Sequence, residues 1–374
     1  MREDISFKFK KAALIIGIFT SSFILVPRST YAINPFNSQI KGDIKPILEE
    51  RFATSRAVKK SKGNFSKVNH RFSVKIPDQG MVNIVFNKAK SKDWKAFFVD
   101  GNGERKEDLS KAALLRGKVF RRSGGSVESF SAAGSVYESK SGLTFKINFS
   151  LPRRSTSQKS GYEVTVKNGE VSLARAPHRL LNRESCGTEI PALSGAITST
   201  EESAKPAISL ATTTPPTLAA TYREVELSAI GDFEFYTTFG SDSANRMASI
   251  MNSSEAIYER DLGVTYNVKS IYVYSTSSQP FNSNNASILL QQMTSARNDG
   301  EPWGTADLYH LFTTRNIFAM SGSSANYSVV GLAYLGVVCD PDFPYGVTER
   351  VSNSLDYIIF AHEIGHNFGA SHDN

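Results

Sequence analysis

Near the end of the chain, three histidines and a glutamate have the spacing of a metal-dependent hydrolase. The residues are His362, Glu363, His366, Gly369 and His372, in the pattern H-E-x-x-H-x-x-G-x-x-H. An α-helix turns once every 3.6 residues, so His362 and His366 share one helix face. Glycine accepts a positive φ at little cost, which lets the chain turn back at Gly369 and bring His372 to the same point. Three imidazoles with one tetrahedral position left free are typical of catalytic zinc.

This set of donors predicts hydrolysis of a peptide bond. Zinc lowers the pKa of its bound water from about 15.7 towards about 7 and polarises a carbonyl group. Glu363 lies next to His362, so its carboxylate reaches that water without binding the metal, takes the proton and passes it to the leaving amine. The competing interpretation is a buried helix whose histidines are simply hydrogen-bonded. Three neutral imidazoles that converge in a core without a metal are difficult to satisfy.

The residues around this motif resemble the metzincin zinc endopeptidases. Asp373, directly after the third histidine, resembles the adamalysin (reprolysin) branch, in which it is expected to support the site by a hydrogen bond. Residues 307–313 resemble the strand before the cleft of that family. Gly331, Leu332, Ala333 and Tyr334 resemble its edge strand. The resemblance implies that this strand lines the cleft and pairs with an extended substrate; the alternative is an ordinary apolar strand.

The resemblance covers residues 222–374 and implies an α/β fold with a mixed five-stranded sheet and an active-site helix. Alternating patterns within this range predict strands near 225–236, 264–274, 306–313 and 329–338. Helices are predicted at 242–262 and 285–297. In the family, a methionine-containing turn and a lower subdomain follow the zinc motif. The sequence therefore predicts a catalytic domain that is truncated just after the motif, with the lower subdomain missing.

Three further segments are predicted before residue 222. Residues 1–32 have the basic start, the apolar stretch and the small residues of a secretory signal peptide. An uncleaved anchor is the alternative, but a span needs about 20 apolar residues. Residues 33–186 read as a β-rich domain, with strands at 72–76, 82–86, 143–149 and 162–166 and a helix at 104–115. Residues 187–221, rich in Ser, Thr, Ala and Pro, read as a linker.

Charge separates the two larger segments. Residues 33–221 carry 31 Lys and Arg against 17 Asp and Glu, whereas residues 222–374 carry 7 against 17. Residues 115–119 and 142–143 weakly resemble adamalysin propeptides, so we expect the basic segment to be a propeptide docked in cis on the acidic domain. Two alternatives stay open: both surfaces are simply solvated, or the basic segment binds polyanions. Nucleic acid is not expected as a partner, because no known recognition module is present.

The chain has two cysteines, and Cys186 lies directly before the linker. A thiolate is a good zinc ligand, so Cys186 is predicted to bind the zinc in the precursor, as in the cysteine-switch latency of related metzincins. A disulfide with Cys339 is the second interpretation, and an unremarkable thiol is the third.

Together these patterns predict a secreted, zinc-dependent metalloendopeptidase that is made as a latent precursor and acts on proteins or peptides. After removal of the signal peptide, no stable insertion into a membrane is expected. The alternative is a catalytically inactive secreted binding or adhesion protein with a metalloprotease-like domain. Glu363 argues against this, because its loss is the simplest way to end catalysis while the metal stays bound.

Overall fold

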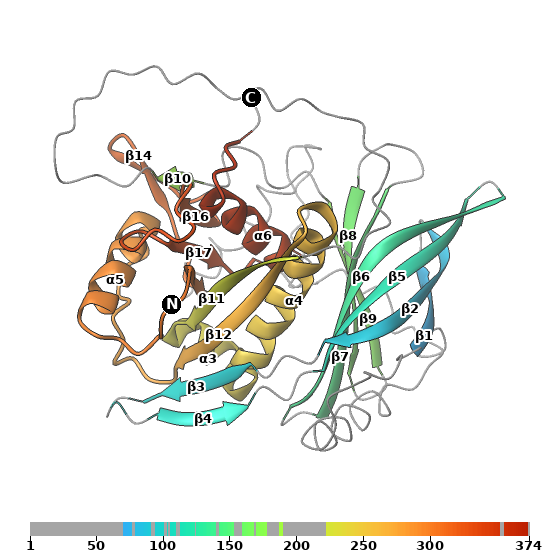
Figure 1. The fold of residues 1–374 in the computed structure, drawn as a ribbon, viewed down its shortest axis with the longest axis horizontal. Coiled ribbons are helices and arrows are strands. Elements are labelled where there is room, and N and C mark those ends of the chain that lie inside the picture. The colour runs from blue at the N-terminus through green and yellow to red at the C-terminus, as the bar shows by residue number, and fades with distance from the viewer. Residues whose placement is uncertain are drawn as a thin grey trace, which may run out of the picture.

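The described residues form two large β-sheets with one long helix between them (Figure 1). The computed structural model describes residues 70–76, 79–90, 94–100, 103, 105–109, 113–123, 125–139, 142–152, 159–167, 170–177, 187–189, 222–351 and 355–372. The predicted signal peptide, most of the predicted linker, Cys186 and Asp373 lie outside these residues. Among the described helices, none is both long and apolar enough to cross a membrane.

In the first sheet, here the N-terminal sheet, the described residues form seven antiparallel strands in the order β1-β2-β5-β6-β7-β8-β9. Alternate residues of β1, such as Phe72, Val74 and Ile76, are buried, as expected where one face of a sheet covers a core. All four strands predicted before residue 187 are confirmed. The strands are β1 (His70–Ile76), β2 (Gly80–Lys90), β5 (Ala113–Ser123), β6 (Ser126–Ser139), β7 (Gly142–Pro152), β8 (Lys159–Lys167) and β9 (Glu170–Pro177).

The second sheet, here the mixed sheet, has five strands from the C-terminal part of the chain, in the order β16-β17-β13-β11-β12. Neighbours in this series are parallel, except that β16 is antiparallel to β17. The predicted α/β class and the mixed five-stranded sheet are confirmed. The strands are β11 (Arg223–Gly231), β12 (Val264–Tyr274), β13 (Leu308–Thr313), β16 (Gly331–Tyr334) and β17 (Tyr345–Glu349). A separate small hairpin joins β14 (Ala319–Ser321) to β15 (Ser324–Asn326).

Segments from earlier in the chain extend the mixed sheet at both edges. A hairpin of β3 (Lys95–Val99) and β4 (Arg105–Leu109) continues it beyond β12. At the opposite edge, β10 (Gly187–Glu189) pairs in parallel with β16. Within the described residues, the sheet therefore has eight strands. The segment boundaries expected at 186 and 221 stay a prediction, since strands from both sides of them share this sheet.

Two local predictions are wrong. Residues 104–115 are not a helix, because Arg105–Leu109 pairs with β3 and Ala113–Ser123 pairs with β2 and β6. The strand expected to reach residue 236 ends at Gly231, where helix α3 (Phe233–Phe239) begins. Asp232 ends the strand because its carboxylate accepts a hydrogen bond from the backbone of Phe235 and caps that helix. The other two predicted helices are confirmed as α4 (Ser243–Asp261) and α5 (Ala286–Asn298).

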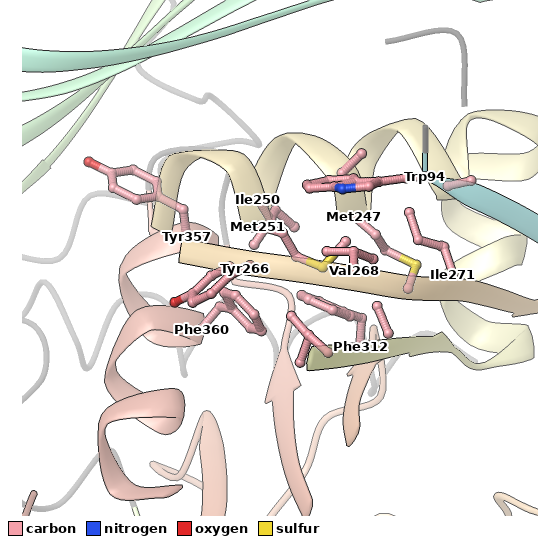
Figure 2. Packing of buried hydrophobic residues seen from close by; sticks show 14 of the residues in the cluster. Trp94, Met247, Ile250, Met251, Tyr266, Val268, Ile271, Phe312, Tyr357 and Phe360 are labelled. Carbon is pink, nitrogen blue, oxygen red and sulfur yellow. The ribbon is translucent and has the colours of Figure 1, made fainter. Parts of the chain in front are cut away.

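Helix α4 lies between the two sheets and contacts both (Figure 1). Its apolar side, with Met247 and Met251, packs on the mixed sheet in a core that includes Tyr266, Phe312 and Phe360 (Figure 2). Its other side is mainly polar and faces the N-terminal sheet. There, Ser249 bonds to Ser135 at 2.7 Å. The last helix, α6 (Asp356–Asn367), packs against α4 and carries the motif histidines.

Candidate metal centre

Helix α6 is buried on most of its surface, as its apolar sequence predicts. Ion pairing fixes its first turn, because Asp356 receives a hydrogen bond from Arg246 of α4 at 2.6 Å. Further along, the hydroxyl of Tyr258 donates to the backbone oxygen of Ala361 at 2.7 Å. Phe360 packs edge-on against the buried ring of His310, with ring centroids 4.7 Å apart. Contacts along its whole length therefore fix the position of the helix that carries the histidine motif.

Gly369 ends this helix in the predicted way. Its φ is +91°, a conformation that favours glycine. The amides of Gly369 and Ala370 donate to the oxygens of His366 (2.8 Å) and Gly365 (3.0 Å), which is the hydrogen-bond pair of a Schellman motif. The chain then reverses and brings His372 back over the helix.

The three histidines converge on one point. Nε2 of His362 lies 3.0 Å from Nε2 of His366 and 3.1 Å from Nε2 of His372. Zn–N bonds of about 2.0–2.1 Å in a tetrahedron would set ligand nitrogens roughly 3.3 Å apart. Nδ1 of His366 lies 2.6 Å from the backbone oxygen of Ala370, so this nitrogen carries the proton and Nε2 is left to bind. The donors and their spacing fit a zinc ion.

Burial keeps the imidazoles of His362 and His366 neutral. Burial, together with a smaller effect of the neighbouring His366 and His372, lowers the pKa of His362 to about 4. Burial also lowers the pKa of His366, although its bond to Ala370 acts in the opposite direction. Because a metal binds only the neutral form of imidazole, His362 and His366 are ready to bind at neutral pH.

The side chain of Glu363 packs against the edge strand β16. It is fully buried. A Cβ atom added to Gly331 would lie 2.2 Å from Oε1 of Glu363 and 2.5 Å from its carboxyl carbon. No real Cβ approaches so closely, so the carboxylate occupies the space that a side chain at residue 331 would need. Gly331, predicted to line the cleft, therefore also sets the position of Glu363.

Asn367, the residue after the second histidine, ties the helix to the sheet. Its amide nitrogen donates to the backbone oxygens of Tyr334 and Tyr345, both at 3.0 Å. The backbone oxygen of Asn367 accepts from the amide of Val337 at 2.8 Å, in the loop that follows β16. The predicted edge strand, Gly331–Tyr334, is thus fixed beside the metal site.

Sequence reasoning missed Asn367, Tyr258 and the Arg246–Asp356 pair. Asn367 could have been found, because a polar side chain beside a ligand on a buried helix needs a partner. Tyr258 and Arg246 give no such signal, since both come from a helix about a hundred residues earlier. The structure brings His362, His366 and His372 together, places Glu363 against Gly331 and turns the chain at Gly369. Cys339 is exposed with a free thiol, while Cys186 and Asp373 lie outside the described residues.

The comparison with protein families agrees with this geometry. Residues 244–373 match the model of the reprolysin-like metallopeptidases of family M12B. This part of the chain is a reprolysin-like metallopeptidase domain. The described part of the domain contains all three converging histidines and the buried glutamate. Its metal dependence follows from the family and from the histidine triad.

A solved structure is also similar to this chain. The crystal structure of metalloproteinase-II from Bacteroides fragilis aligns with a TM-score of 0.42 and 14% sequence identity. The alignment covers 86% of this chain and 85% of that chain.

Proposed function

We propose that the protein is the latent precursor of a secreted, zinc-dependent endopeptidase. The observation that carries this proposal is the convergence of three imidazole Nε2 atoms at a helix whose Glu363, next to the first histidine in sequence, is fully buried. Three neutral nitrogen donors suit zinc. Bound zinc supplies a Lewis acid and acidifies a water molecule. Glu363 serves as the base that holds the proton and returns it to the leaving amine.

Pairing at the edge strand supports latency. The backbone of Gly187–Glu189 pairs with Leu332–Tyr334 of β16. That is the strand along which an extended peptide would add to the sheet. One edge accepts one strand, so β10 and a substrate compete for the same place. Cys186 comes directly before β10, which favours it as the zinc ligand of the precursor over a partner of Cys339 in a disulfide.

Contacts between the two sheets support docking of the N-terminal segment in cis. Arg116 of β5 forms ion pairs with Glu255 at 2.8 Å and Glu259 at 2.9 Å, both on α4. Glu163 of β8 lies 3.5 Å from Arg246. The two Arg116 pairs follow the charge difference between the basic segment and the acidic domain, whereas the Glu163–Arg246 pair has the opposite polarity. Secretion is supported by the signal-peptide pattern of residues 1–32.

The test is peptide cleavage by the protein expressed from its natural reading frame, before and after a cut in the segment 190–221. We expect cleavage only after the cut, loss of cleavage with a chelator, and recovery with added zinc. Glu363→Gln should keep stoichiometric zinc and lose about 10²- to 10⁴-fold in kcat. If the cut protein binds zinc but cleaves no peptide, the alternative of an inactive binding protein is correct.

A further inference from the structure

The edge of β12 is a strand-accepting surface that the N-terminal segment already fills. Ala96 to Val99 of β3 pair in parallel with Ile271 to Tyr274, residue for residue. Beyond the last pair, the backbone amide of Ser275 donates to the oxygen of Val99 at 2.8 Å. All four β12 residues of this register are buried. Without the hairpin, the sheet would end in an open edge of apolar and aromatic residues.

Side chains add to the backbone pairing. Trp94, just before β3, is 5% exposed and belongs to the same apolar core as Met247 and Ile271 (Figure 2). The ring of Phe97 stacks on Tyr272, with centroids 5.0 Å apart and an interplanar angle of 16°. The hairpin is therefore part of the core of the metallopeptidase domain, although it comes from the other side of the predicted linker.

The other contact of the N-terminal segment has a different character. Along α4 it consists mainly of polar pairs: Ser135 with Ser249, Asn148 with Ser253 at 3.0 Å, and Arg116 with the two glutamates. Leu114 and Tyr137 add apolar contact. Water can replace hydrogen bonds of this kind when the two surfaces separate. Water cannot replace the burial of Trp94 and Phe97 or the pairing of β12.

We propose that the hairpin 94–109 stays bound to the β12 edge after the connecting segment is cut, so that the working peptidase is a two-chain complex. This inference rests on the proposed latent precursor. It assigns two separate tasks to one segment: the hairpin anchors it at one edge of the mixed sheet, and β10 occupies the cleft at the opposite edge. Activation then requires β10 to leave β16 but does not require the N-terminal sheet to leave the protein.

The experiment places a site for a sequence-specific protease in the segment 190–221 of the full chain. After the cut, the two fragments are run together by size exclusion at 0.15 M and at 1 M NaCl, where the Debye length falls from about 8 Å to about 3 Å. We expect co-elution at both salt concentrations, and continued protection of the Ser275 amide from hydrogen exchange. Separate elution with a folded C-terminal fragment would overturn the proposal.

Two variants locate the anchor. In Trp94→Ala the dissociation constant of the two fragments should rise by roughly 10²- to 10³-fold, since truncation of a buried tryptophan leaves a large cavity. Arg116→Gln removes charge from the polar contact and should keep the fragments together in 1 M NaCl. If Arg116→Gln instead raised the dissociation constant more than Trp94→Ala, the anchor would be the contact with α4, and the proposed role of the hairpin would be refuted. Should Trp94→Ala not fold, exchange at Ser275 in the cut wild type decides the question.

Peptide cleavage by the same cut sample separates this inference from the proposed function. Fragments that stay together without cleaving peptides would refute the peptidase and support the anchor. Fragments that separate and leave an active C-terminal fragment would refute the anchor and support the peptidase.

Discussion

Substitution of Gly331 by alanine should displace Glu363, the proposed catalytic base, without touching any of the three proposed metal ligands. An alanine Cβ would lie 2.2 Å from Oε1, 2.5 Å from Cδ and 2.8 Å from Cγ of Glu363. Ordinary contacts of this kind are 3.4–4 Å long, so the carboxylate must move by about 1 Å or more. A misplacement of about 1 Å can cost 10²-fold in rate, or about 2.7 kcal/mol in the activation barrier.

The assay is kcat/KM for a peptide substrate, measured on the cut protein alongside its zinc content. We expect kcat to fall about 10²-fold while the zinc stoichiometry stays at that of the wild type. Gly231→Ala is the matched control: it also adds a methyl group to a strand of the mixed sheet, but that methyl meets the flexible sulfur of Met247 at 3.1 Å. A Gly331→Ala protein with full zinc and wild-type kcat would refute the claim that this glycine positions Glu363.

Three further results are expected. Burial lowers the pKa of His310 to about 3. Between pH 6.5 and pH 3, this imidazole is therefore protonated in the unfolded chain but neutral in the folded protein. The free energy of unfolding should therefore decrease by up to about 1.4 kcal/mol for each unit by which the pH is lowered from 6.5 to 3. Urea titrations at several pH values should show a weaker pH dependence of this free energy in His310→Gln. Asn367→Ala should cost about 1–3 kcal/mol of stability, because the oxygens of Tyr334 and Tyr345 lose their donor, and should raise KM for peptides; unchanged urea midpoints would contradict this role. Cys186→Ser should give cleavage by the uncut protein, whereas unchanged latency would exclude the thiol as the switch.

The sequence predicted the convergence of the three histidines because these residues are close together in the chain. The spacing of His362 and His366 and the glycine at 369 depend only on helix geometry and a local turn. Four of the seven strands that the structure describes in the N-terminal sheet (β1, β2, β7 and β8) were also predicted, since alternation of apolar residues indicates one buried face. Strand β17 was missed, although all of its residues are buried, because five residues are too few to show a period.

Long-range pairing could not be predicted in this way. Residues 105–109, Arg-Lys-Glu-Asp-Leu, have a composition that suits a helix, yet they form a strand because β3 provides a neighbour. The sequence of β3 does not indicate that its pairing partner is β12. The role of Gly331 was likewise only half predicted: the family pattern placed it on the edge strand, but only the structure brings Glu363 against its backbone.

The hairpin also has a consequence for the order in which the protein folds. Most strands of the N-terminal sheet pair with a neighbour that follows within a few residues, so this sheet can form early during synthesis. Strand β3 interrupts it and must wait for β12, which is made much later. Pairing between strands that are far apart in the sequence is intrinsically slow, so we expect docking of the hairpin on β12 to be a late step in folding. In refolding experiments, the fluorescence change of Trp94 should then follow the recovery of β-structure rather than accompany it.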